Sequence, residues 1–160
     1  NEKWKSELFE CLILHIPGHT SGHICIYIKE LNALFTGDTL FSLGCGRIFE
    51  GTYEEMYNSL NKLKKFPLNT KIYCGHEYTK KNSDFCLTID KKNPNLIQKI
   101  DEIKRNLKNG TPTVPSTLHD ELKCNIFLRS DNTEIQNQLG INSGDAIETF
   151  TKLRELKDNF

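Results

Sequence analysis

The sequence lacks the features that mark membrane proteins and nucleic-acid-binding proteins. No apolar run approaches the roughly 20 residues that a membrane-spanning helix needs, and the opening stretch NEKWKSELFE has no signal-peptide core. Lys plus Arg and Asp plus Glu both number 21, so no net basic field attracts nucleic acid or an anionic membrane. These absences predict a cytoplasmic protein, with an organelle left open, and neither a nucleic acid nor a membrane as partner.

Cysteine spacing and chain length narrow the class of protein further. The six cysteines lie far apart without a C-x-x-C pair, which argues against a zinc knuckle and a disulfide framework, so we expect reduced and mostly buried thiols. The 160 residues suffice for one globular domain or for parts of two. Since the chain opens at Asn1 without an initiator methionine, we interpret it as a fragment or a processed form.

The hydrophobic pattern predicts a first half built of strands and a second half built of helices. Short runs rich in Ile, Leu and Phe, bounded by Gly, Pro and Asn, are typical of strands. Such runs cover Phe9–Ile16, His23–Ile28, Ala33–Gly37 and Lys71–Cys74. After about Tyr78 the pattern is helical, so we expect a mixed α/β fold with an all-helical second half.

Three helices are predicted from capping residues and apolar spacing. The first lies within Thr52–Pro67 and opens with a capping box. The second lies within Asn93–Gly110, with an asparagine cap, a proline in the first turn and a glycine stop. The third runs from Asp145 towards Phe160 with apolar residues on one side. A proline-rich connector, GTPTVPST, precedes a further segment around Leu118–Arg129.

A glycine followed by a titratable residue occurs after three of the predicted strands. The stretches IPGHT, FTGDT and YCGHE place His19, Asp38 and His76 in loops at strand ends, where a sheet presents functional groups. Glycine permits positive φ and close backbone approach, which lets the next side chain turn inward. Imidazole and carboxylate suit zinc, iron or manganese, and a carboxylate can bridge two ions. We therefore predict a shared metal site.

Structural roles and cysteine chemistry are the alternatives for these residues. A histidine after a turn is often only hydrogen-bonded, and an aspartate there is often a turn or cap residue. We interpret the remaining histidines, His15, His23 and His119, as structural. A nucleophilic Cys74 or Cys45 with a histidine base is a rival hypothesis, although nothing in the sequence marks either thiol as a low-pKa site.

Six stretches of the chain form a recognisable set of motifs. They are PGHTSGH (17–23), FTGDTLF (35–41), GCGR (44–47), FEGT (49–52), YCGHEYT (73–79) and TPTVPSTL (111–118). Through them the chain resembles the C-terminal part of glyoxalase II, the hydroxyacylglutathione hydrolases of the metallo-β-lactamase superfamily. The motifs with glycine-linked histidine or aspartate belong to the superfamily, whereas GHEYT and TPTVPSTL are specific to the glyoxalase II branch.

The resemblance implies a fold, a metal centre and a reaction. The fold is the second half of an αββα sandwich, residues 1–78, followed by a helical glutathione-substrate-binding domain, residues 79–160. His19 binds one divalent metal ion, His76 binds the other, and Asp38 bridges them; the metals are zinc, or iron or manganese. A metal-bound hydroxide hydrolyses S-D-lactoylglutathione, or a related 2-hydroxyacyl thioester, to glutathione and the hydroxy acid.

The resemblance also implies the residues that contact glutathione, whose two carboxylates need local cations. These are Arg47, Phe49, Tyr78, Arg154 and Lys157. Family members often have tyrosine where this chain has Phe49, and several have lysine in place of Arg47. For Arg154 and Lys157 a merely solvated charged helix face stays an alternative.

One family motif is missing from the chain. The T-H-x-H-x-D-H stretch that supplies the other metal ligands does not occur in the 160 residues. We therefore expect this chain alone to bind metal weakly and to be inactive, and to dimerise or exchange strands through an exposed sheet face. Two alternative functions stay open: a mononuclear-iron persulfide dioxygenase of the same fold, and a non-catalytic fragment that binds glutathione conjugates.

Overall fold

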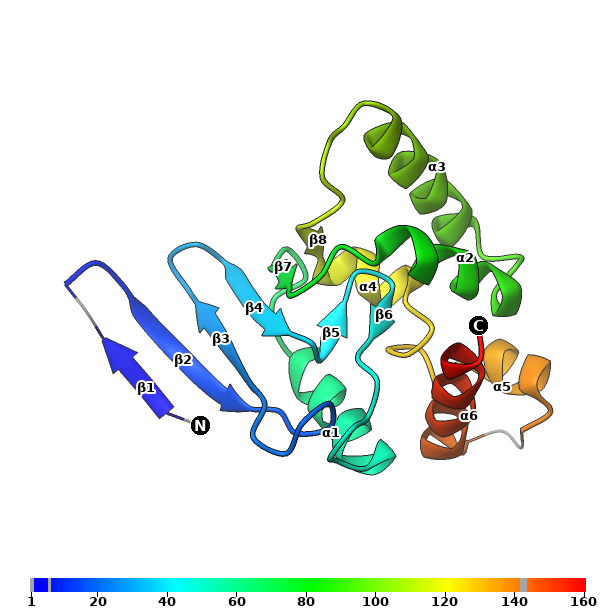
Figure 1. Cartoon of the computed structure of the whole chain (residues 1–160), viewed down its shortest axis with the longest axis horizontal. Helices are drawn as coiled ribbons and strands as arrows, with labels where there is room; N and C mark the ends of the chain where they lie inside the picture. Colours follow the sequence, from blue (N-terminus) through cyan, green and yellow to red (C-terminus); the bar gives the residue numbers. More distant parts are fainter. Residues whose placement is uncertain (1, 6, 142–143) are drawn as a thin grey trace.

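A twisted sheet, built mostly from the first half of the chain, is the centre of the fold (Figure 1). The computed structural model describes residues 2–5, 7–141 and 144–160. The main sheet has six strands in the order β1-β2-β3-β4-β7-β8, and β5 and β6 form a separate hairpin. The strands are β1 Glu2–Lys5, β2 Glu10–His15, β3 Ile24–Ile28, β4 Ala33–Gly37, β5 Leu40–Phe41, β6 Gly44–Cys45, β7 Lys71–Cys74 and β8 Ser116–Thr117.

The pairing register sorts the apolar side chains of the sheet onto two faces. Residues that pair directly share a face, so Leu34 and Ile72 lie on one side and Phe35 and Tyr73 on the other. The first side is buried, whereas Phe35 is 39% exposed on the second. The second side, here called the open face, carries Trp4, Ile13, Ile24, Ile26, Phe35 and Tyr73. An apolar face is therefore left uncovered in this chain.

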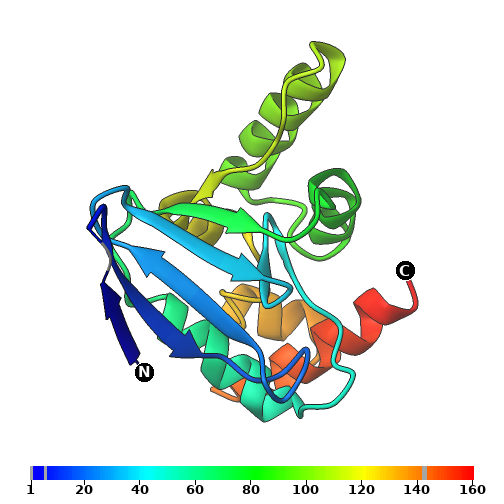
Figure 2. The same cartoon turned by 60° about the vertical axis from the view of Figure 1, so that its left-hand side comes forward.

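Helix α1 (Tyr53–Leu63) covers the buried side of the sheet (Figure 2). Thr52 and Glu55 form the predicted capping box, because each side chain accepts the main-chain N–H of the other. The helix buries Met56, Leu60 and Leu63 in one core with strand residues such as Leu34. It ends at Leu63, so the turn before Pro67 is not helical.

The second half contains five helices among the described residues. They are α2 Thr79–Ile89, α3 Pro94–Lys108, α4 Leu118–Cys124, α5 Thr133–Leu139 and α6 Ala146–Asp158. The predicted cap at Asn93 is confirmed, and Asp145 also caps its helix, since both side chains accept main-chain N–H groups of the first turn. None of the described helices is both long and apolar enough to cross a membrane.

The prediction of an all-helical second half is wrong at strand β8. Ser116 and Thr117 pair antiparallel with Ile72 and Lys71 of β7. The proline-rich connector is extended, as residues before and at proline tend to be, and this conformation can join a sheet edge. Strand β8 therefore attaches the helical half to the sheet.

Candidate metal and substrate site

The three predicted metal ligands meet at one edge of the sheet. Strands β4 and β7 are parallel, so their carboxyl ends lie together, and the Gly75 N–H donates to the Gly37 carbonyl at 2.9 Å. The Nε2 atoms of His19 and His76 lie 3.5 and 3.4 Å from the same Asp38 oxygen, Oδ2. The structure therefore brings together all three residues that the glycine pattern selected.

Two of the glycines beside these residues are required for different reasons. Gly37 has φ of +51°, a left-handed conformation that a side chain disfavours. Gly75 lies outside that region, but a Cβ there would lie 2.4 Å from Asp38 Oδ1. Positive φ therefore explains the glycine before Asp38, and close approach to the carboxylate explains the glycine before His76.

The protonation of His19 follows from its bond to the main chain. Its Nδ1 lies 2.7 Å from the Arg47 carbonyl oxygen, and because a carbonyl only accepts, Nδ1 carries the proton. In the neutral ring Nε2 then directs a lone pair at the Asp38 carboxylate. Two facing acceptors need a proton or a cation between them, and neighbouring ligands of a tetrahedral zinc ion lie about 3.4 Å apart. The donor set therefore fits a divalent metal.

His23 supports Asp38 in a structural role. Its Nε2 accepts the main-chain N–H of Asp38 at 3.0 Å, so this nitrogen is not available to a metal. Burial, followed by the neighbouring His19 imidazole, lowers the pKa of His23, which favours the neutral ring that can accept. The interpretation of this histidine as structural agrees with these contacts.

The three side chains do not complete a metal site by themselves. Across residues 2–5, 7–141 and 144–160, no group of three or more His, Cys, Asp and Glu side chains is arranged to hold an ion. His19 and His76 both approach Asp38, but a zinc ion takes four ligands, or three and a water. Weak metal binding by this chain alone therefore stays a prediction.

The predicted substrate residues Phe49 and Tyr78 contact the imidazoles through their rings. Arg47 contacts His19 through its main-chain carbonyl, and the side chains of all three residues are exposed. Arg47 is 55% exposed at its side chain, and Phe49 is 67% exposed with its ring centroid 5.0 Å from that of His19. The Tyr78 ring stacks on His76 with centroids 4.9 Å apart. An incoming molecule could touch these side chains and the candidate metal ligands together.

Arg154 and Lys157 differ from each other in environment. Arg154 is only 4% exposed, and its guanidinium donates to the Cys45 carbonyl at 2.7 Å and to Asp158 Oδ1 at 3.0 Å. Lys157 Nζ lies 5.1 Å from the Phe85 ring centroid and 4.9 Å from that of Phe160. Burial, then the charges of Lys81 and Arg154, lowers the pKa of Lys157 to about 8. The alternative that Arg154 belongs to a merely solvated charged helix face is therefore wrong.

The segment from Ser42 to Gly46, which includes β6, is held by buried polar residues that the sequence analysis did not select. The Glu121 carboxylate accepts the Leu43 N–H at 2.9 Å, and Asn125 Nδ2 donates to the Gly44 carbonyl at 3.0 Å. Asn82 donates to the Ser42 carbonyl at 3.0 Å. Because this segment lies between Asp38 and Arg47, the helical half fixes the spacing between the candidate metal and substrate residues.

In the described part of the chain, no histidine side chain is bonded as a base to either cysteine proposed as a rival nucleophile. The Cys74 thiol donates to the His76 carbonyl oxygen rather than to an imidazole, at 3.2 Å. Burial is the main cause that raises the pKa of both Cys45 and Cys74, which disfavours the thiolate. All six thiols are free, as expected.

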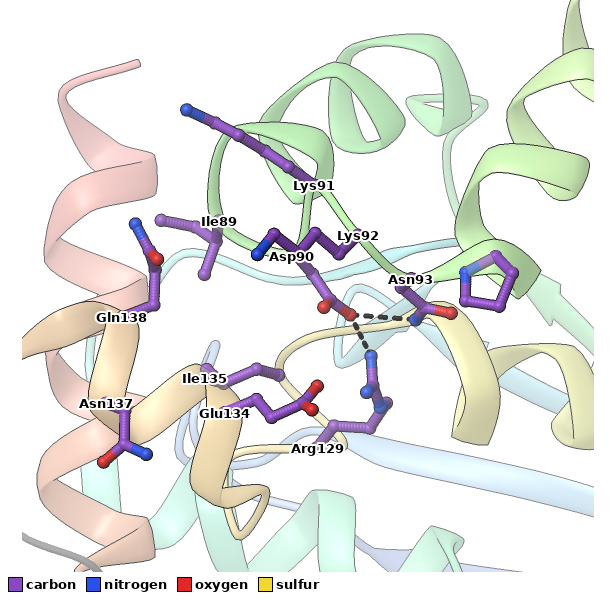
Figure 3. A pocket seen from close by; sticks show the side chains of 11 residues that line it. Ile89, Asp90, Lys91, Lys92, Asn93, Arg129, Glu134, Ile135, Asn137 and Gln138 are labelled. Carbon is purple, nitrogen blue, oxygen red and sulfur yellow. Dashed lines mark hydrogen bonds and ion pairs between the residues drawn. The ribbon is translucent and has the colours of Figure 1, made fainter.

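A cavity of about 690 Å³ between the α2–α3 turn and α5 contains none of the candidate site residues. Figure 3 shows its lining side chains, in which the Asp90 carboxylate accepts from both Asn93 and Arg129. These polar groups already satisfy one another. The cavity therefore does not compete with the His19, Asp38 and His76 cluster as the reactive site.

Family models match both halves of the chain. The model described as "Hydroxyacylglutathione hydrolase C-terminus" matches residues 77–160, and that of the metallo-beta-lactamase superfamily matches residues 10–76. A hydroxyacylglutathione hydrolase of Pelagibacter ubique is 57% identical over 157 residues, covering 98% of this chain and 60% of the relative. One of Rhodospirillum rubrum is 46% identical over 151 residues, covering 94% and 59%. This chain thus spans about three fifths of these relatives.

Solved structures and family models agree on the fold. ETHE1 from Myxococcus xanthus matches with a TM-score of 0.61 at 20% identity, over 96% of this chain and 48% of that one. The BLEG-1 B3 metallo-beta-lactamase gives 0.54 at 21% identity, over 80% and 46%. At such low sequence identity, these two matches show that the chain shares the metallo-β-lactamase fold and nothing more. Since the C-terminal family model covers more than half of the residues, the chain belongs to the hydroxyacylglutathione hydrolase family of the metallo-β-lactamase superfamily.

Proposed function

We propose that this chain is the C-terminal part of an enzyme that hydrolyses S-(2-hydroxyacyl)glutathione thioesters, with S-D-lactoylglutathione as substrate. The products are glutathione and the 2-hydroxy acid. The observation that carries the proposal is the approach of two imidazoles to one Asp38 oxygen beside the exposed Arg47 cation. The name of the matching relatives, hydroxyacylglutathione hydrolase, supports the substrate class.

His19 would hold one metal ion, His76 the other, and Asp38 would be shared. Two divalent cations, zinc or else iron or manganese, supply a lowered water pKa and a polarised thioester carbonyl when bound. The Arg47 carbonyl holds His19 in the tautomer that offers Nε2, and His23 holds the Asp38 main chain. The protein's part is thus to fix these donors in the neutral or anionic form that a cation requires.

The substrate carboxylates would meet the cationic side chains next to the donors. Arg47 offers an exposed guanidinium, Lys157 an ammonium that can charge below about pH 8, and Tyr78 a hydroxyl. Phe49 offers an apolar surface against His19, and Arg154 adds positive charge from below the surface. We assign all five residues to substrate binding within this proposal.

The remaining parts of the site would come from the same polypeptide. We propose a metallo-β-lactamase-type part in residues 1–78 and a substrate-binding part in residues 79–160, and the family matches that meet between residues 76 and 77 support this division. Further metal ligands would come from a part that packs on the open face. Alone, the 160-residue chain would lack activity.

The test compares the complete product of the reading frame with its Asp38→Asn variant. Loss of thioester absorbance reports hydrolysis of S-D-lactoylglutathione, and we expect the variant to lose nearly all activity and to hold less metal. Asp101→Asn on α3 is the matched control, because Asp101 is an exposed carboxylate that pairs with Lys104. Hydrolysis by Asp38→Asn at the parent rate would refute the proposal. Oxygen uptake with glutathione persulfide tests the dioxygenase alternative, which the hydrolase match over residues 77–160 disfavours.

A further inference from the structure

Asp158, at the end of α6, joins the two arginines assigned to the substrate. Its Oδ1 accepts from Arg47 Nε at 3.1 Å and from Arg154 Nη2 at 3.0 Å. Both contacts are charge-assisted hydrogen bonds, which are stronger than neutral ones. One carboxylate oxygen therefore links a loop of the first half to the last helix of the second half.

Arg47 depends on Asp158 for its position. Its guanidinium donates from Nε to Asp158 Oδ1 and from Nη2 to the Asp158 carbonyl, the latter at 3.5 Å. Its side chain is otherwise largely exposed. Both contacts use the edge formed by Nε and Nη2, which leaves the edge formed by Nη1 and Nη2 for another acceptor. That edge has the geometry to bind a carboxylate through two parallel hydrogen bonds.

Arg154 gives Asp158 a fixed support. The Arg154 guanidinium is buried, donates to the Cys45 carbonyl at 2.7 Å, and lies 5.3 Å from the Phe127 ring centroid. Asp158 is thus fixed by the buried Arg154 and in turn binds the exposed Arg47. With two arginines on one carboxylate, the cluster keeps a net positive charge towards an anionic ligand.

We propose that Asp158 is a positioning residue that preorganises Arg47 for a carboxylate of the glutathione moiety. This inference rests on the proposed function and adds a residue to it. Without Asp158 the Arg47 side chain would have to be immobilised when the substrate binds, at a cost in affinity of roughly three- to tenfold. The opposite role, a carboxylate that competes with the substrate for Arg47, predicts tighter binding when Asp158 is removed.

The experiment measures KM and kcat for S-D-lactoylglutathione, and the Kd of S-methylglutathione by calorimetry, in the complete polypeptide. Asp158→Ala should raise KM and Kd about three- to tenfold while kcat changes little. Asp158→Glu should restore part of the affinity. Asp131→Ala is the matched control, because it removes an exposed ion pair with Lys64 elsewhere. An unchanged or lowered KM in a folded Asp158→Ala variant would overturn the inference.

A double-mutant cycle separates positioning from a general loss of structure. In an Arg47→Met background, Asp158→Ala should change KM less than about twofold, because the side chain to be positioned is gone. A full effect in that background would overturn the inference. If Asp158→Ala fails to fold, Asp158→Asn takes its place in the same cycle. A parent enzyme that neither hydrolyses the thioester nor binds S-methylglutathione would instead refute the proposed function.

Discussion

His19 and Arg47 are joined by a hydrogen bond of 2.7 Å from the imidazole Nδ1 to the main-chain carbonyl, across 28 residues of sequence. The bond links a candidate metal ligand to the loop that carries a candidate substrate contact. A shift of that loop would therefore change both the tautomer of His19 and the place of the guanidinium. Metal affinity and substrate affinity should respond together to changes in this loop.

Replacement of Gly75 by alanine should damage the metal centre without unfolding the protein. The added Cβ would lie 2.4 Å from Asp38 Oδ1, so the carboxylate must turn away from its position between His19 and His76. We expect metal affinity to fall at least about tenfold, the size of effect seen when ligand support is lost. Gly22→Ala is the matched control, because nothing lies within 4 Å of its Cβ position. Equal metal titrations for the two variants would contradict the prediction.

Replacement of Glu121 by glutamine should remove a pH-dependent cost of folding. Burial is the main cause that raises the pKa of Glu121, so the folded chain holds its proton at a pH where the unfolded chain, with a pKa near 4.5, has released it. The free energy of unfolding therefore falls as pH rises from about 4.5 through the folded pKa. Glutamine can still accept from the Leu43 N–H and Asn125 without this loss.

Urea unfolding at a series of pH values measures this effect. The Glu121→Gln variant should gain stability relative to the parent as pH rises through that window. The exposed Glu155→Gln serves as control. Parallel stability curves for Glu121→Gln and the parent would show that the buried carboxyl does not titrate as we predict.

Lys157 should titrate near pH 8. Burial, then Lys81 and Arg154, lowers its pKa to about 8 from 10.5, so between these values the unfolded chain binds the proton that the folded chain has released. Stability should therefore rise with pH from about 8 to 10.5, whereas affinity for an anionic ligand should fall as the ammonium is lost. NMR of ¹³C-methylated lysines gives the midpoint, with the resonance assigned by Lys157→Met. A midpoint near 10.5 would contradict the prediction.

The open face should make the isolated chain associate. Trp4, Ile24 and Phe35 expose large apolar areas on one side of the sheet, and a second copy of the chain could cover them. We expect light scattering to detect a concentration-dependent dimer, which Phe35→Glu weakens about tenfold or more. Leu107→Glu on α3 is the control for an exposed leucine outside this face. A parent chain that stays monomeric would argue against this interface.

Strong local signals made much of the fold predictable. Strands β2, β3, β4 and β7 follow runs of branched and aromatic residues, and α1, α3 and α6 follow side-chain caps. Helix α2 begins at Thr79 and has no side-chain cap from Tyr78, and α5 has only seven residues, so neither helix has a strong local signal in the sequence. Strand β8 forms through its pairing with β7, which no local pattern reveals.

Part of the candidate site, like part of the fold, could be predicted from the sequence. His19, Asp38 and His76 were found because each follows a glycine at a strand end, a local feature. Glu121 and Asp158 act on residues 78 and 111 positions away, respectively, so only the folded chain shows their partners. A buried carboxylate on a helix looks like any surface charge in the sequence until its neighbours are known.

Strand β8 has a consequence for how the protein would respond to cleavage. Strand β8 pairs with β7, and the next residue, Leu118, adds a further bond to the first half of the chain. Its N–H donates to the Thr70 carbonyl at 2.9 Å. A protease cut between residues 78 and 79 should therefore leave two peptides that remain bound as one particle. They should melt in a single cooperative transition.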